Sequence, residues 1–440
     1  MTHLSRRNFL ITSGAVAAGT VVAHGCSSSK PSAENTTAPS AKPAADSVSV
    51  AANAPAVETT KAKLGFIALT DSAPLIIAAE KGLFAKYGMK DVEVSKQASW
   101  PVTRDNLVLG SEGNGIDGAH ILSPMPYLMA TGKITQNKPL PLYILARLNL
   151  NGQGISVGSA FKDTIQSGKG DAFAKAKAGG KGFKKVAVTF PGGTHDLWMR
   201  YWLAAGGINP DSDVSTVPVP PPQMVANMKV GNMDAFCVGE PWNAQLVNQN
   251  IGYSAMVTGE LWNDHPEKAF TMRADWVDKH PNAAKAILMA IMEAQQWCDK
   301  PENTEEMVKI ISGSKWLKVP PQDILGRFKG EIDYGDGRKE ANYQYKMKFW
   351  ANNASYPYKS HDTWFITENI RWGYLPADTK VKELVDKVNR EDLWKEAAKA
   401  VGVTEIPATS SRGVETFFDG VKFDPEKPEE YLKGLKIKKA

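Results

Sequence analysis

The stretch FPGGTHDLWMRYWLAAGG, residues 190–207, has the pattern of a strand end, a sharp bend and a helix. Two consecutive glycines permit the bend, because glycine adopts backbone angles that other residues avoid. Thr194 suits the N-cap of the helix, and Asp196 suits its positively polarised first turn. The first turn of a helix carries unpaired N–H groups that bind anions, so we expect an anion beside His195.

The alternation of strand and helix extends in both directions from this stretch. Upstream, the pattern predicts strands at residues 64–69 and 91–97 and a helix at residues 75–84. Downstream, the alternation continues through PEKAFTMRADWV, residues 266–277. This order indicates an α/β fold with mostly parallel sheets. Beyond it, helical patterns dominate, and the aromatic-rich C-terminal tail is expected to be irregular.

The composition is that of a globular protein with a large core. The chain has 440 residues, of which 42% are hydrophobic and 22% are charged. Its formal net charge of +5 is spread over the whole length, without a basic block of five or more residues. This distribution argues against a nucleic-acid partner.

The N-terminus has the features of an export signal. Arg6 and Arg7 precede an apolar stretch at residues 9–23, which is too short for a membrane span. The twin arginines resemble the export type that carries folded proteins. The sequence AHGC ending at Cys26 resembles a bacterial lipoprotein cleavage site, so Cys26 is expected to carry the lipid. Residues 26–60 contain no aromatic side chain and are predicted to be a disordered tether.

Two further cysteines follow the predicted cleavage site. Cys237 lies in an apolar run and Cys298 in an amphipathic helical pattern. An exported protein can form a disulfide, which leaves a Cys237–Cys298 bridge as an alternative. We favour two buried free thiols, because an unpaired cysteine behaves as a small apolar side chain.

Polar residues follow several predicted strands at positions where a solvent-facing role is not obvious. Ligands of α/β sheets bind beyond the C-terminal ends of strands. Each residue has an ordinary structural alternative: a packing tryptophan, a solvated glutamine or lysine, or a surface histidine. Together they gather hydrogen-bond donors suited to an ion with several acceptor oxygens. The five candidates are Trp100, Gln153, His195, Gly239 and Lys268.

Enzyme signatures are absent from the sequence. There is no His-x-x-x-His pair, paired-cysteine metal motif, Gly-x-Ser-x-Gly or phosphate-binding P-loop, and no Gly-x-Gly-x-x-Gly follows a predicted strand. We therefore expect a binding protein that uses neither a metal nor a cofactor.

Longer motifs carry a family resemblance over the chain after the tether. They include TRDNLVLG, GIDGAHILSPMPYL, ARLNLNGQGI, TFPGGTHDLWMRYWLAAGG, FCVGEPW and NASYPYKSHDTWFITENIRWGY. The chain resembles the nitrate, sulfonate and thiamine-precursor class of periplasmic binding proteins. Within it, the motifs are most similar to the cyanobacterial nitrate- and bicarbonate-binding lipoproteins of ABC transporters.

The resemblance implies a type II-like periplasmic binding protein, with two α/β lobes and the ligand in a cleft between them. It divides the chain into a signal peptide (residues 1–25), the tether (26–60), lobe 1 (61–150), lobe 2 (151–264), and a final part (265–440). That final part is expected to return to lobe 1 with a helical region and a C-terminal extension that wraps the body.

The resemblance also implies a ligand and its contacts. In the nitrate-binding members, the matching motifs place the ligand against Trp100, Gln153, His195, Gly239 and Lys268, with secondary roles possible for Thr194 and Glu240. The expected protein is a monomer that captures nitrate, and nitrite as a second ligand, and delivers it to the permease and ATPase subunits. The expected location is the periplasmic face of the inner membrane, through lipid on Cys26.

Two other functions remain open at this point. A bicarbonate-binding protein is the alternative within the family, and a nitrate-sensing receptor is the alternative outside transport. A site made only of donors favours nitrate, because a buried bicarbonate hydroxyl would meet another donor at a cost of about 1–3 kcal/mol. The bicarbonate-binding members are expected to have an acid at Lys268 and to recruit calcium. Glu240 is the residue that could supply the acceptor that bicarbonate needs.

Overall fold

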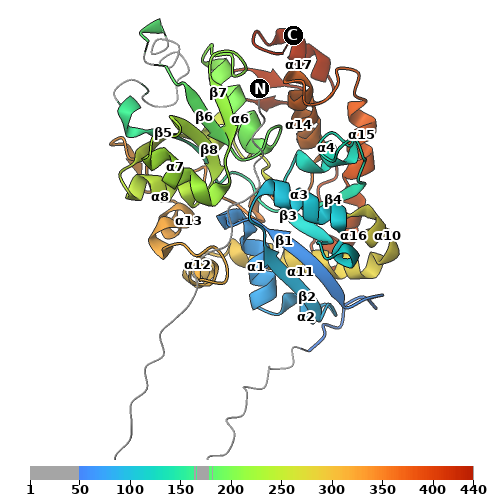
Figure 1. The fold of residues 1–440 in the computed structure, drawn as a ribbon. Coiled ribbons are helices and arrows are strands. Elements are labelled where there is room, and N and C mark those ends of the chain that lie inside the picture. Colours follow the sequence, from blue (N-terminus) through green and yellow to red (C-terminus); the bar gives the residue numbers. More distant parts are fainter. Residues whose placement is uncertain (1–48, 163–164, 166–177, 181, 440) are drawn as a thin grey trace, which may run out of the picture. The chain divides into compact units, whose positions relative to one another are not determined.

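A computed structural model describes residues 49–162, 165, 178–180 and 182–439 (Figure 1). The predicted signal peptide, the lipidation site Cys26 and the tether as far as residue 48 lie outside the described residues. No helix in the described part of the chain is both long and apolar enough to cross a membrane.

Two five-stranded sheets form the framework of two lobes. The sheet of lobe 1 has, in spatial order, β2 (Asp91–Lys96), β1 (Lys61–Phe66), β3 (Gly118–Leu122), β10 (Lys268–Arg273) and β4 (Leu142–Arg147). The sheet of lobe 2 has β7 (Ser215–Pro218), β6 (Lys185–Val188), β8 (Ala235–Gly239), β5 (Gln153–Gly158) and β9 (Gly252–Val257). The expected pair of α/β lobes is confirmed.

One strand in each sheet runs against its neighbours. β1 pairs in parallel with β2 and β3, whereas β10 is antiparallel to both β3 and β4. In lobe 2, β6 pairs in parallel with β7 and β8, whereas β5 is antiparallel to both β8 and β9. The sheets are therefore mixed: the prediction of mostly parallel sheets holds for four strands of each sheet, and the sequence did not indicate the reversed fifth strand. The alternation of strand and helix does not encode the direction of a strand that enters from the other lobe.

Helices cover the two sheets. The helices up to the return into lobe 1 are α1 (Ala73–Glu80), α2 (Leu83–Lys86), α3 (Trp100–Leu109), α4 (Met125–Ala130), α6 (Thr194–Ala205), α7 (Met224–Lys229), α8 (Trp242–Asn248) and α9 (Thr258–Leu261). The later helices are α10 (Ala274–Lys279), α11 (Pro281–Cys298), α12 (Thr304–Ser312), α13 (Leu325–Lys329), α14 (Lys359–Arg371), α15 (Val381–Val388), α16 (Glu391–Ala400) and α17 (Pro428–Gly434). Two short hairpins complete the fold: β11 (Ile332–Asp333) with β12 (Lys339–Glu340), and β13 (Glu415–Thr416) with β14 (Lys422–Phe423).

The chain crosses between the lobes in two segments that lie side by side. The first joins β4 to β5 and the second precedes β10. The N–H of Asn151 donates to the carbonyl of His265 at 3.0 Å, and the N–H of Glu267 donates to that of Asn149 at 3.2 Å. These paired segments deliver the first residues of β5 and β10 to the region between the lobes.

The C-terminal extension packs against both lobes. Arg147 of β4, in lobe 1, forms a buried ion pair with Asp362 of α14. Trp364, on the same helix, stacks on Trp198 of lobe 2 with 4.9 Å between ring centroids. These contacts are consistent with the expected C-terminal extension that wraps the body.

The last part of the predicted tether contacts lobe 1. The N–H of Ala51 donates to the carbonyl of Lys86 at 2.8 Å. The Glu58 carboxylate accepts the N–H groups of Asn282 and Ala283, at the start of α11, at 3.1 and 3.0 Å. Residues 49–60 are thus part of the fold rather than of the tether. The composition of residues 49–60 did not indicate these contacts, because they use main-chain groups and one carboxylate instead of large apolar side chains.

Cys237 and Cys298 are both buried and unbonded. They lie in different elements, β8 of lobe 2 and α11. The favoured interpretation of two free thiols is confirmed, and the alternative of a bridge between them is not.

Candidate functional site

The antiparallel strands β5 and β10 explain how the predicted residues meet. Gln153 is the first residue of β5 and Lys268 is the first residue of β10. Because each runs against its neighbours, each starts at the edge where the parallel strands end. Gln153 accordingly pairs in register with Gly239, the last residue of β8, and Lys268 pairs with Leu122, the last residue of β3.

Gly239 lies at a point where lobe 2 is close to lobe 1. A Cβ atom built on it would lie 2.6 Å from Oε1 of Gln153 and 3.1 Å from Cδ2 of Leu69 in lobe 1. It would also lie 3.4 Å from Oδ2 of Asp71. The backbone can therefore come this close to the opposite lobe only without a side chain, which agrees with the choice of Gly239 from the sequence.

The sequence pattern predicts that Trp100 ends a strand, but in the structure it is the first residue of α3. Ser99 caps this helix by accepting the N–H of Val102 at 3.4 Å. The indole is fully buried, 5.6 Å from the ring of His120 and 6.0 Å from the ammonium of Lys268. Its Nε1 donor has no hydrogen-bond partner among the described residues. A buried donor without a partner is costly, so this N–H points to a missing acceptor.

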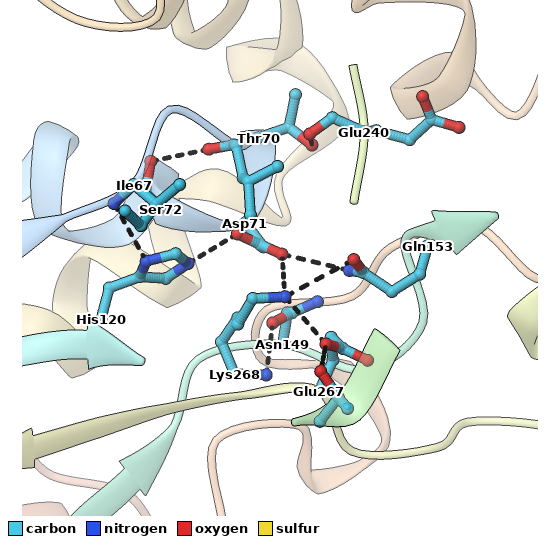
Figure 2. Close-up of polar contacts among 12 residues, drawn as sticks. Ile67, Thr70, Asp71, Ser72, His120, Asn149, Gln153, Glu240, Glu267 and Lys268 are labelled. Carbon is cyan, nitrogen blue, oxygen red and sulfur yellow. Dashed lines mark hydrogen bonds and ion pairs between the residues drawn. The ribbon is translucent and has the colours of Figure 1, made fainter. Parts of the chain in front are cut away.

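Lys268 lies between two buried carboxylates (Figure 2). Its Nζ is 2.9 Å from Oδ2 of Asp71 and 2.8 Å from Oε1 of Glu267. All three side chains are fully buried. We refer to Asp71, Gln153, His195, Glu267 and Lys268 as the Lys268 cluster.

The prediction of a site made only of donors is therefore wrong. Asp71 and Glu267 are not among the site residues predicted from the sequence. Asp71 lies in the 3₁₀ turn at residues 70–72. Glu267 directly precedes Lys268, and neighbours on a strand usually face opposite ways. It contacts the same ammonium because it lies just outside β10.

The pKa values follow from burial and from these ion pairs. Burial alone would lower the pKa of Lys268, but the carboxylates of Asp71 and Glu267 raise it above its ordinary value. Burial would raise the pKa of Asp71, but Lys268 and His120 hold it well below its usual range. The pKa of Glu267 is likewise lowered, mainly by Lys268 against the effect of burial. All three groups are therefore ionised at neutral pH.

His195 has a partner on each ring nitrogen. Its Nε2 donates to Oε1 of Gln153 at 2.7 Å, and its Nδ1 is 2.5 Å from the hydroxyl of Thr189. Burial, and then the charge of Lys268, lower the pKa of His195 to about 3. The ring is therefore neutral at neutral pH in this structure.

A chain of hydrogen bonds continues from His195 across the lobes. Nε2 of Gln153 donates to Oδ2 of Asp71 at 3.1 Å. Oδ1 of Asp71 in turn accepts Nε2–H of His120 at 2.6 Å. Gln153 belongs to lobe 2, whereas Asp71 and His120 belong to lobe 1, so this chain joins the two lobes at the cluster.

Thr194 and the following turn of α6 support Glu267. The residue before Thr194, Gly193, is the N-cap of α6, so the prediction of Thr194 as the cap is wrong by one residue. The Thr194 hydroxyl donates to Oε1 of Glu267 in a short hydrogen bond, and Nε1 of Trp198 donates to Oε2 at 2.7 Å. Thr194 thus contacts the cluster through a carboxylate.

Glu240 is beside the cluster but its carboxylate points away (Figure 2). Its Oε1 is 3.3 Å from Nε of Arg327, and its Oε2 accepts the N–H of Ala244 at 3.0 Å. The carbonyl of Glu240, by contrast, accepts the N–H of Thr70 in the other lobe at 2.8 Å. Glu240 therefore contacts the opposite lobe through its main chain, and its side chain does not supply an acceptor to the cluster.

No group of three or more histidine, cysteine, aspartate or glutamate side chains placed to hold a metal ion occurs within residues 49–162, 165, 178–180 and 182–439. The Lys268 cluster agrees with this finding, because the ammonium of Lys268 occupies the position between its two carboxylates.

Comparison with known proteins agrees with this architecture. Residues 55–312 match the model of the NMT1-like family. The chain belongs to the NMT1-like family. The family resemblance seen in the motifs is confirmed.

Two of the curated relatives that match nearly end to end illustrate the range of similarity. One is the "Nitrate/nitrite binding protein NrtA" of Nostoc sp., 70% identical and aligned over 100% of both chains. The other is the "Bicarbonate-binding protein CmpA" of Synechococcus elongatus, 44% identical over 99% of both chains.

Among solved structures, the periplasmic nitrate-binding protein NrtA from Synechocystis PCC 6803 is 63% identical. It matches with a TM-score of 0.85 over 87% of this chain and 100% of that one. An alkanesulfonate-binding protein from Xanthomonas axonopodis, at 13% identity and a TM-score of 0.52, shares the fold over 74% of this chain and 98% of that one.

Proposed function

We propose that this protein is the substrate-binding component of an ABC transporter for nitrate, with nitrite as a second ligand. The observation that carries the proposal is the buried ammonium of Lys268, 6.0 Å from the centroid of the Trp100 ring, whose indole N–H lacks a partner among the described residues. The relative that is 70% identical carries the name of a nitrate/nitrite binding protein, which supports the same assignment.

Four of the five residues expected from the sequence are proposed to contact nitrate directly, and His195 is proposed to act through one of them. Trp100, Gln153 and Lys268 supply donors from side chains, and Gly239 allows the backbone to approach. His195 holds Gln153 in position and lies 3.6 Å from Glu267, at the same end of the cluster. Thr194 acts through Glu267, and Glu240 acts through its main chain.

The argument for nitrate over bicarbonate now rests on which polar groups are already paired. The carboxylate oxygens of Asp71 accept from His120, Lys268 and Gln153. Those of Glu267 also accept from side-chain donors. Of the five residues predicted from the sequence, Trp100 has the side-chain polar atom left without a partner in the described part of the chain, and that atom is a donor. An anion with acceptors only therefore fits best.

Bicarbonate is the second candidate, because one specific observation favours it. The cluster contains two carboxylates that could accept a hydroxyl if a donor moved away from either of them. A relative named for bicarbonate binding is 44% identical over 99% of both chains.

The proposed setting is delivery to a membrane permease from the periplasmic face of the inner membrane. A relative named "Nitrate import ATP-binding protein NrtC" is 33% identical over 87% of this chain and 56% of that one, which links this type of module to a transporter ATPase. We further propose a monomer that is tethered through lipid on Cys26 and uses no cofactor. A sensing role is the competing proposal for the same binding site.

Isothermal titration calorimetry on the mature protein tests the proposal. Nitrate and nitrite should bind with one site per chain, and bicarbonate should bind more weakly both with and without calcium. Calcium-dependent bicarbonate binding that is tighter than nitrate binding would assign the protein to the second candidate. Binding of none of these anions would reject both.

A further inference from the structure

The Lys268 cluster has more negative than positive charge before an anion is added. Asp71 and Glu267 are both ionised, and they share one ammonium. The histidines beside them, His120 and His195, are neutral because burial lowers the pKa of each. A monovalent anion placed here would raise the excess negative charge of a fully buried site, which is strongly unfavourable without compensation.

The two carboxylates are poor places for a compensating proton. Each accepts hydrogen bonds on both oxygens, from Lys268 and from neighbouring side chains. A proton on either one would displace a donor that is already in place. Burial raises the pKa of the nearby Cys237 thiol, which therefore stays neutral and has no site for a further proton. Of the described groups beside the cluster, the histidines are left as the proton acceptors.

Only one of these histidines combines a suitable partner with a central position. Nδ1 of His120 faces the N–H of Ile67 at 3.5 Å, so a proton there would meet another donor. His265 donates from Nδ1 to the carbonyl of Pro266, and its Nε2 faces the Thr258 hydroxyl, so it too has a partner for a second proton. Among the described residues, however, its hydrogen bonds go to Pro266 and Thr258 rather than to a side chain of the cluster, and its Nδ1 is 3.9 Å from Glu267.

Nδ1 of His195 faces a hydroxyl, and a hydroxyl can turn from donor to acceptor. On the opposite side of the ring, Nε2 already donates to Gln153 within the cluster. His195 can therefore become doubly protonated without losing either hydrogen bond.

We propose that the site binds one proton together with nitrate, at Nδ1 of His195, while the Thr189 hydroxyl turns to accept it. The proton comes from the solvent, a new N–H bond forms, and no bond within the protein breaks. The inference rests on the proposed function, since it requires nitrate at the Lys268 cluster.

The sign of the pH dependence follows from the charges around His195. The positive charge of Lys268 and the presence of His265 oppose protonation of the ring, whereas the negative charges of Glu267 and Asp71 favour it. The negative charge of nitrate favours protonation as well. Nitrate thus raises the pKa of His195 from its ligand-free value of about 3. Between that value and the new one, nitrate affinity should fall about tenfold for each unit of rising pH.

Calorimetry at pH 6 in buffers of different ionisation enthalpy counts the protons directly. The measured enthalpy should change with buffer enthalpy with a slope that corresponds to about one proton taken up per nitrate. A slope of zero with normal nitrate binding would overturn this inference alone. Absence of nitrate binding would instead overturn the proposed function, and the inference with it.

Two conservative variants of one residue identify the proton acceptor. Thr189→Ser keeps the hydroxyl and should keep proton uptake. Thr189→Val has a similar shape without an acceptor for Nδ1–H, so proton uptake should fall toward zero and nitrate affinity should lose its pH dependence. His280→Gln, at the start of α11 and outside the cluster, is the control and should behave as wild type. Full proton uptake in Thr189→Val would contradict the assignment to His195.

Discussion

At the scale of single residues, Lys268 combines two tasks. It neutralises Asp71 and Glu267 inside the protein, and it is proposed to face nitrate. Lys268→Ala should weaken nitrate binding roughly 10- to 150-fold, because a charge-assisted hydrogen bond contributes about 1.5–3 kcal/mol. Titration of nitrate into the variant measures this, with the exposed lysine variant Lys229→Ala as control. Unchanged affinity in Lys268→Ala would mean that nitrate binds elsewhere.

Trp100 allows binding to be separated from folding. Trp100→Phe removes an N–H that has no partner in the described residues, so the free energy of unfolding without ligand should barely change. Nitrate affinity should fall roughly 2- to 12-fold, which corresponds to about 0.5–1.5 kcal/mol for a lost hydrogen bond.

Trp394→Phe is the matched control for this variant. The indole of Trp394 donates to Ser355 at 3.0 Å, far from the cluster in sequence, so its loss should lower stability and leave nitrate affinity unchanged. Urea unfolding and nitrate titration of both variants check the crossed pattern. Equal effects of the two substitutions on affinity would contradict the assignment of Trp100.

The low pKa of His195 also makes a prediction about stability. In the ligand-free protein the ring stays neutral down to about pH 3, whereas in the unfolded chain it binds a proton below its ordinary value near 6.5. Its contribution to stability is therefore lost as pH falls through that window. His195→Gln should reduce the pH dependence of urea unfolding between pH 6.5 and 4.5 by about one proton. An unaltered pH dependence would place the histidine in a solvated environment.

At the scale of secondary-structure elements, the start of α11 depends on a residue far away in sequence. The Glu58 carboxylate accepts two of the unpaired N–H groups in the first turn of α11, and those bonds lower its pKa against the effect of burial. Glu58→Ala should reduce the free energy of unfolding by about 0.5–2 kcal/mol, the usual range for a helix cap.

A chain that begins at residue 49 should match the full mature chain in urea unfolding, whereas one that begins at residue 61 should be less stable. Equal stability of the two truncated chains would return residues 49–60 to the tether.

Many elements were predictable because their local patterns agree with the fold. The strand at β2 and the bend before α6 follow from apolar alternation and from Pro191-Gly192-Gly193. The strand expected at residues 64–69 is β1, three residues earlier at Lys61–Phe66, and the helix expected at residues 75–84 is divided at Gly82 into α1 and α2. The helix α14 was missed within the tail that was expected to be irregular. It carries Arg371, Glu368 and Asp362 inside the protein, each held in a buried ion pair, so its sequence lacks a simple apolar stripe.

The five candidate residues were predictable because they lie at the termini of strands and helices, where side chains and backbone groups are available to a ligand, and the structure places all five in or beside one region between the lobes. What sequence could not supply was the pairing among them. Asp71 is 197 positions from Lys268 along the chain, a separation at which no local pattern reports a contact. The neutral state of His195 is similarly a product of burial by both lobes.

At the scale of the whole molecule, the two sheets are joined by two crossing segments and by hydrogen bonds at the cluster. Thr70 donates its N–H to the carbonyl of Glu240, and Nε1 of Trp242 donates to the carbonyl of Ala68 at 3.1 Å. A ligand that contacts both lobes should strengthen this closed arrangement. Nitrate at 100 times its dissociation constant should stabilise the fold by about 2.7 kcal/mol, measured as a rise in Tm. A Tm that does not respond to saturating nitrate would contradict binding to the folded state.

The most direct test of the central claim is a crystal structure of the mature protein with nitrate bound. The account predicts nitrate between the lobes, with oxygen atoms about 3 Å from Nε1 of Trp100 and from Nζ of Lys268. It also predicts Nδ1 of His195 at hydrogen-bond distance from Thr189. Nitrate bound at another place, with the indole N–H of Trp100 still unpaired and Lys268 contacting only Asp71 and Glu267, would contradict it.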